Sequence, residues 1–131
     1  MRIDHLGIAV ESLDSARAVW EGALGAPLGA VEEVPQQGVR VAFLSVGESH
    51  LELLEPTGPE TAVGRFLARG GRGVHHVAFA VPSVDAALRA LAARGQRLID
   101  PVGRPGARGR RVGFAHPSAF GGVLVEFVEA P

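Results

Sequence analysis

The chain contains no cysteine, no lysine, no asparagine and no tyrosine, and its aromatic side chains are six phenylalanines and one tryptophan. Without cysteine, disulfide bonds and thiolate chemistry are excluded. No stretch approaches the roughly 20 apolar residues of a membrane-spanning helix, and the N-terminus lacks the segments of a secretion signal. We therefore expect a cytoplasmic protein, and 131 residues predict one domain.

All 13 basic residues are arginines, and their distribution is uneven. Residues 1–71 carry ten acidic residues and five arginines, whereas residues 72–131 carry four acidic residues and eight arginines. Four of these arginines lie within eight residues that contain no acid, namely Arg104, Arg108, Arg110 and Arg111. Such a cluster either binds an anionic ligand or forms a solvated loop, and the sequence favours neither.

The chain repeats itself. The segment His5–Val10 returns as His76–Val81, 71 residues later, and Leu51-Glu52-Leu53 returns as Val125-Glu126-Phe127, 74 residues later. His5 lies 47 residues before Glu52, and His76 lies 50 residues before Glu126. Two halves related by an approximate twofold axis would bring two histidines and two glutamates to one point, which suits a divalent metal ion.

Periodicity predicts the order βαβββ in each half, and hence an α+β fold of two modules that form an open half-barrel. In the first half we expect strands at 2–10, 28–34, 39–46 and 50–55 and a helix that begins after Ser12 and ends at Gly25. In the second half we expect strands at 73–81, 97–99, 111–116 and 123–129 and a helix over 83–94. The predicted domain organisation is a first module at about 1–58, a linker helix at about 59–72 and a second module at about 73–131.

Alternation also predicts the environment of the four candidate ligands. His5 shares its strand face with Gly7 and Ala9, and the matching neighbours of His76 are alanines. Glu52 and Glu126 have aliphatic neighbours, and a carboxylate in that setting needs a metal ion or another cation beside it. The sequence therefore predicts a metal site made of His5, Glu52, His76 and Glu126. We interpret His75 as structural, and leave open whether His50 and His116 contact substrate.

The duplicated βαβββ pattern resembles the vicinal oxygen chelate superfamily, which is also called the glyoxalase/bleomycin resistance/dioxygenase superfamily. Within it, the chain is most similar to the methylmalonyl-CoA epimerase family. The resemblance covers nearly the whole chain, and its most specific part lies near the C-terminus. The residues that carry it are Asp4–Val10, Gln37–Val39, Leu51–Pro56, Gly73–Val77, Gly106, Gly109, Val112, Phe114–Pro117 and Gly121–Glu126.

The resemblance implies an isomerase that epimerises an acyl-CoA thioester, with cobalt, manganese, nickel or zinc on the four predicted ligands. The ion would stabilise an enolate formed α to the thioester, and Glu126 would transfer the proton. The arginine cluster and Ser118, where this family tends to carry lysine, would contact the coenzyme A part of the substrate. A homodimer is also expected, because open half-barrels leave strand edges that favour pairing.

The chain departs from this family at the second acid/base, which the resemblance implies just before the Gln-Gly turn. Gln36 stands there, and an amide cannot exchange a proton at neutral pH. Glu33 would face away, and Glu32 would lie about 13 Å along an extended strand. We expect Gln36 to line the pocket and orient the substrate.

Three alternatives remain open. A glyoxalase-I-like isomerase or lyase needs only one metal-bound glutamate, with the arginines holding glutathione carboxylates. An extradiol-type dioxygenase uses two histidines and one glutamate, so the additional Glu52 argues against it. A non-catalytic module that sequesters antibiotics would lack metal ligands and would need more aromatic residues than this chain has.

Overall fold

The computed structural model describes residues 1–131, with eight strands, three α-helices and three short 3₁₀ helices. The chain divides into two compact units. The N-terminal unit comprises His5–His75, and the C-terminal unit comprises Met1–Asp4 together with His76–Pro131. The order βαβββ occurs twice, so the predicted α+β class is confirmed, whereas the boundaries of the two predicted modules stay a prediction.

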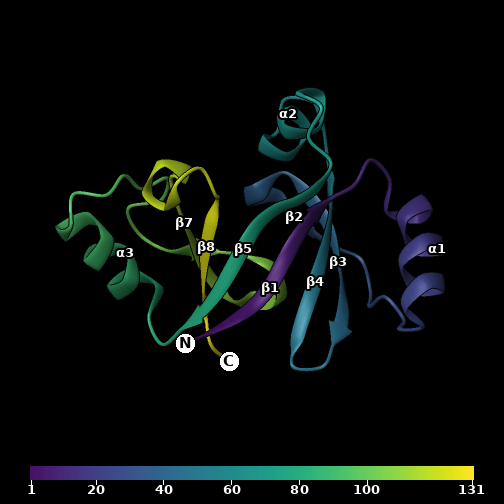
Figure 1. The fold of residues 1–131 in the computed structure, drawn as a ribbon, viewed down its shortest axis with the longest axis horizontal. Helices are drawn as coiled ribbons and strands as arrows, with labels where there is room; N and C mark the ends of the chain where they lie inside the picture. The colour runs from purple at the N-terminus through teal and green to yellow at the C-terminus, as the bar shows by residue number, and fades with distance from the viewer. The chain divides into compact units, whose positions relative to one another are not determined.

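Four strands form the sheet of the N-terminal unit, in the order β2-β3-β4-β1 (Figure 1). Strand β4 pairs in parallel with β1 and antiparallel with β3, and β3 pairs antiparallel with β2. Helix α1 packs on one face, where Leu13, Trp20 and the aliphatic side chains of the strands form a core. The elements of this unit are β1 (Arg2–Ala9, which begins in the C-terminal unit), α1 (Leu13–Leu24), β2 (Glu32–Val34), η1 (Pro35–Gln37), β3 (Val39–Val46), β4 (Ser49–Pro56) and α2 (Ala62–Ala68).

The C-terminal unit has the corresponding sheet, in the order β5-β8-β7-β6. Strand β8 pairs in parallel with β5 and antiparallel with β7. Helix α3 packs closely on β7. A Cβ atom at Gly113 of β7 would lie only 2.7 Å from the Cδ1 atom of Leu88 in α3. The elements are β5 (Gly73–Val81, which begins in the N-terminal unit), α3 (Val84–Ala93), β6 (Arg104–Pro105), η2 (Ala107–Gly109), β7 (Arg111–Ala115), η3 (Pro117–Phe120) and β8 (Val125–Glu129).

A glutamate at the end of the last strand caps the helix of each unit. The backbone N–H of Leu13 donates to Oε1 of Glu55 at 2.8 Å, and that of Val84 donates to Oε2 of Glu129 at 3.0 Å. These carboxylates accept hydrogen bonds from N–H groups that have no partner within the helix. The negative charge of each carboxylate also lies at the positive end of the helix dipole. The repeat of Glu55 as Glu129 in the sequence therefore has a structural cause.

We expect Glu129→Ala to lower the free energy of unfolding by about 1 kcal/mol, which is the usual cost of losing a helix cap. Urea denaturation followed by circular dichroism measures the change, with Glu33→Ala, at an exposed position, as the control. Equal stability of the two variants would contradict a capping role.

Two predicted strands differ from the observed ones. The strand expected over 28–34 is confined to β2, and Leu28 forms only an isolated bridge with Leu44. Glycine at position 29 offers no side chain to pack on the sheet. At 97–99 there is no strand, because the N–H groups of Ile99 and Asp100 both donate to the carbonyl oxygen of Phe114, which interrupts a regular ladder.

The helices of the structure are all too short or too polar to cross a membrane.

Candidate metal-binding and active site

A histidine and a glutamate meet on the face of the N-terminal sheet opposite α1. The register pairs Glu52 with Gly7 of β1 and with Phe43 of β3, so these residues share a face. The Nε2 atom of His5 lies 3.3 Å from Oε1 of Glu52, and both side chains are about 95% buried. The ring of Phe43 stands edge-on to the imidazole of His5, and the two ring centres are 5.7 Å apart.

The C-terminal unit contains the same arrangement. The register pairs Glu126 with Ala78 of β5 and with Phe114 of β7. The Nε2 atom of His76 lies 3.2 Å from Oε1 of Glu126, again between buried side chains. The ring of Phe114 stands edge-on to that of His76, with 5.6 Å between the ring centres, as Phe43 does to His5. The two halves thus repeat a histidine, a glutamate and a phenylalanine in one geometry.

These buried pairs have the donor chemistry of a metal site. All four residues are buried, and each offers one ligand atom, an imidazole nitrogen or a carboxylate oxygen. Such donors suit zinc, cobalt, nickel and manganese. An ionised carboxylate without a cation would be costly at this depth. The residues therefore fit a divalent ion, and in each unit the structure brings together the two ligands that the sequence predicts for it.

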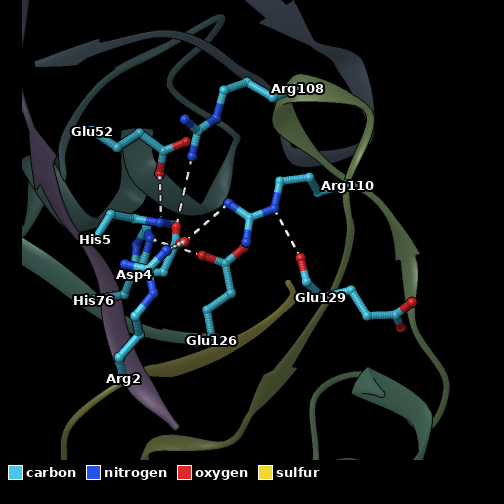
Figure 2. Close-up of polar contacts among 9 residues, drawn as sticks. All are labelled: Arg2, Asp4, His5, Glu52, His76, Arg108, Arg110, Glu126 and Glu129. Atoms are coloured by element: carbon cyan, nitrogen blue, oxygen red, sulfur yellow. Dashed lines mark hydrogen bonds and ion pairs between the residues drawn. The ribbon is translucent and has the colours of Figure 1, made fainter. Parts of the chain in front are cut away.

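A buried aspartate that the sequence analysis left without a role organises the arginines of the C-terminal unit. The side chain of Asp4 is only 1% exposed, and Oδ1 accepts a hydrogen bond of 3.0 Å from Nη1 of Arg110 (Figure 2). The guanidinium of Arg108 lies 3.7 Å from the other carboxylate oxygen, and that of Arg2 lies 3.8 Å from Oδ1. The Nε–H of Arg110 donates to the carbonyl oxygen of Glu129 at 2.9 Å. Asp4 shares its strand face with Leu6 and Ile8, and an acidic residue on that apolar face was the available signal.

The other two clustered arginines also have carboxylate partners. Arg104 pairs with Asp100 at 3.0 Å, and its guanidinium lies 5.6 Å from the centre of the Phe114 ring. Arg111 donates two hydrogen bonds, of 2.9 and 3.0 Å, to Asp85. The pKa of Asp85 is lowered by the hydrogen bond from the backbone N–H of Gly103 and by the bond from Arg111. Arg111 therefore has a structural partner in the first turn of α3, whereas Arg104 contacts a ring of the His76 and Glu126 face.

The backbone of Arg108 supports a functional interpretation of its segment. Its φ is 58° and its ψ is 29°, the left-handed region that few residues other than glycine adopt. Strained backbone of this kind occurs often at functional sites, where the surroundings hold it in place.

The structure places the remaining predicted residues in two turns. Gln36 is exposed in η1. At the start of η3, the N–H of Ser118 donates to Nδ1 of His116 at 3.1 Å, and the Ser118 hydroxyl lies 2.8 Å from the same nitrogen. Because Nδ1 accepts the N–H, the neutral ring carries its proton on Nε2. Substrate contacts of Gln36 and Ser118 stay predictions.

Comparison with known proteins gave consistent matches. The model of the Glyoxalase/Bleomycin resistance protein/Dioxygenase superfamily matches residues 4–114. The Bacillus subtilis protein YqjC, described as uncharacterized, is 41% identical over 128 residues, which cover 98% of this chain and 91% of that protein. The mitochondrial methylmalonyl-CoA epimerase of Bos taurus is 37% identical over 130 residues, 98% of this chain and 74% of the bovine protein.

A solved structure extends this likeness to the fold. A variant of the Streptomyces coelicolor methylmalonyl-CoA epimerase, in complex with 2-nitronate-propionyl-CoA, superposes with a TM-score of 0.94 at 40% identity. The superposition covers 99% of this chain and 94% of the Streptomyces chain. The predicted fold of two βαβββ modules is therefore confirmed.

Proposed function

Since this chain belongs to the glyoxalase/bleomycin resistance/dioxygenase superfamily, we propose that it is a metal-dependent epimerase of a dicarboxylic acyl-CoA thioester such as methylmalonyl-CoA. The observation that carries this proposal is the pair of buried His–Glu contacts, His5 with Glu52 and His76 with Glu126. They occur in a chain that resembles methylmalonyl-CoA epimerases over 98% of its length.

In this proposal, the two pairs hold one divalent ion, which is cobalt, manganese, nickel or zinc. When bound, the ion would act as a Lewis acid for the negative charge that develops when a proton leaves the carbon α to the thioester. Gly7 pairs with Glu52, and Ala78 pairs with Glu126, so each glutamate lies beside a small residue.

Glu126 is the proposed proton-transfer group. Its carboxylate lies 3.2 Å from the imidazole of His76 and is shielded from water, so it stays close to one position. A carboxylate fixed in this way can take the α-proton as the electron pair moves into the enolate, and can return it afterwards.

The arginines are proposed to receive the anionic parts of the substrate. Arg2, Arg108 and Arg110 all lie close to the carboxylate of Asp4, so three guanidinium groups gather at one place. A group of guanidiniums attracts anions, such as an acyl carboxylate or the phosphates of coenzyme A. Arg104, Arg111, Ser118 and Gln36 remain proposed contacts from the sequence, and a homodimer remains the proposed assembly.

The test is exchange of the α-proton of methylmalonyl-CoA in D₂O, followed by NMR. Protein stripped with a chelator should exchange at the background rate, and addition of cobalt, manganese, nickel or zinc in turn should restore exchange with at least one ion. Elemental analysis of the purified protein should find about one divalent ion per chain. No exchange with any ion, together with turnover of a glutathione hemithioacetal, would replace the proposal with a glyoxalase-I-like activity.

A further inference from the structure

The register of the N-terminal sheet places a further carboxylate on the face that carries Glu52. Glu32 of β2 pairs with Val41 of β3, and Val41 pairs with Leu54 of β4. Residues that pair across strands point to the same side, and so do residues two apart along a strand. Glu32 therefore shares the side of Leu54 and Glu52.

The neighbouring glutamate is on the opposite side. Glu33 pairs with Arg40, which pairs with Glu55, the residue that caps α1. Glu33 is exposed, whereas Glu32 is partly buried beside Val41, whose side chain is completely buried. Of two adjacent acidic residues, only Glu32 faces the side of the proposed reaction.

The spacing of a sheet gives the separation of the two glutamates. Glu32 and Glu52 lie two strands and two residues apart, which corresponds to roughly 12 Å between their Cα atoms at the usual spacing of strands and residues. Glu32 and Glu52 thus present their side chains to the same side of the sheet. A substrate bound beside Glu52 on this face would therefore lie on the same side of the sheet as Glu32.

Epimerisation needs two groups that handle protons, because the proton leaves one side of the α-carbon and another arrives on the opposite side. The sequence assigns one role to Glu126, and Gln36 cannot fill the other. We propose that Glu32 is the second acid/base, an inference that rests on the proposed epimerase function. One carboxylate removes the α-proton as the C–H bond breaks and the electron pair enters the enolate. The other, protonated beforehand, donates its proton as the new C–H bond forms, and exchange with water restores both groups.

The experiment measures α-proton exchange in D₂O separately for the 2R and 2S epimers of methylmalonyl-CoA, with metal-loaded protein. We expect Glu32→Gln to slow inversion at least 100-fold, within the usual range for loss of a general acid or base. One epimer should still exchange its proton with retention of configuration, because Glu126 still serves that side. The other epimer should lose exchange. Glu33→Gln is the matched control and should behave as the unmodified protein.

Two further measurements separate a catalytic role from a structural one. Glu32→Gln should keep the metal content and the melting temperature of the unmodified protein, and Glu32→Asp should recover part of the inversion rate. Normal inversion by Glu32→Gln, or an equal loss of exchange for both epimers, would overturn the role of Glu32 alone. Absence of exchange in the unmodified protein would overturn the epimerase proposal, and the role of Glu32 with it.

Discussion

Glu126→Gln is expected to lower the rate of α-proton exchange by about 10³-fold for the epimer whose proton Glu126 removes, since loss of a general base costs 10² to 10⁴ in rate. A glutamine can still offer an oxygen to a metal ion, but it cannot accept the proton. The measurement is exchange in D₂O at saturating methylmalonyl-CoA, together with the metal content of each variant.

The repeat supplies the comparison for this variant. In the other unit, Oε1 of Glu52 lies 3.3 Å from the imidazole of His5, much as Oε1 of Glu126 lies 3.2 Å from the imidazole of His76. Glu52, however, has no proposed part in proton transfer. Glu52→Gln should therefore weaken metal binding, because a neutral amide oxygen replaces a charged carboxylate oxygen, and at saturating metal it should retain most of the exchange rate. If the two glutamine variants lose the same amount of activity at saturating metal, Glu126 acts only as a ligand.

Asp4→Asn is expected to lower the free energy of unfolding by about 3–5 kcal/mol, which is the usual cost of breaking a buried ion pair by removing one partner. Asp4 is 1% exposed and Arg110 is 13% exposed, so water cannot replace the lost carboxylate beside the guanidinium. Urea denaturation measures the change. The double variant Asp4→Asn/Arg110→Met should be more stable than Asp4→Asn, because it also removes the buried positive charge.

A surface ion pair provides the contrast. Glu11 and Arg72 are 2.7 Å apart, but their side chains are 66% and 75% exposed. Glu11→Gln should change stability by less than about 1 kcal/mol, because water screens exposed pairs. A similarly small effect of Asp4→Asn would show that the pair with Arg110 contributes little to the fold.

Local sequence features were sufficient for the helices and for most strands. Ser12 and Ser83 cap their helices, with hydroxyl groups that accept from the N–H groups of Ser15 and Ala86. Gly25 ends α1 in the left-handed conformation, with a φ of 65°. These outcomes depend on residues within one turn of each other, so the sequence predicts them well. Not every apolar side chain of α1 faces the core, since Val19 and Leu24 are 64% and 51% exposed.

The sequence by itself determined the duplicated α+β fold and its four buried metal-ligand candidates, because both follow from alternation along strands and from a repeat at constant spacing. The tertiary structure alone decided which carboxylates balance the arginines, since Asp4 and Arg110 are 106 residues apart in the chain. It also decided the side on which Glu32 lies, because that side follows from the pairing of three strands. The physical reason is that cross-strand register and buried ion pairs depend on contacts between residues distant in the sequence, which no local pattern encodes.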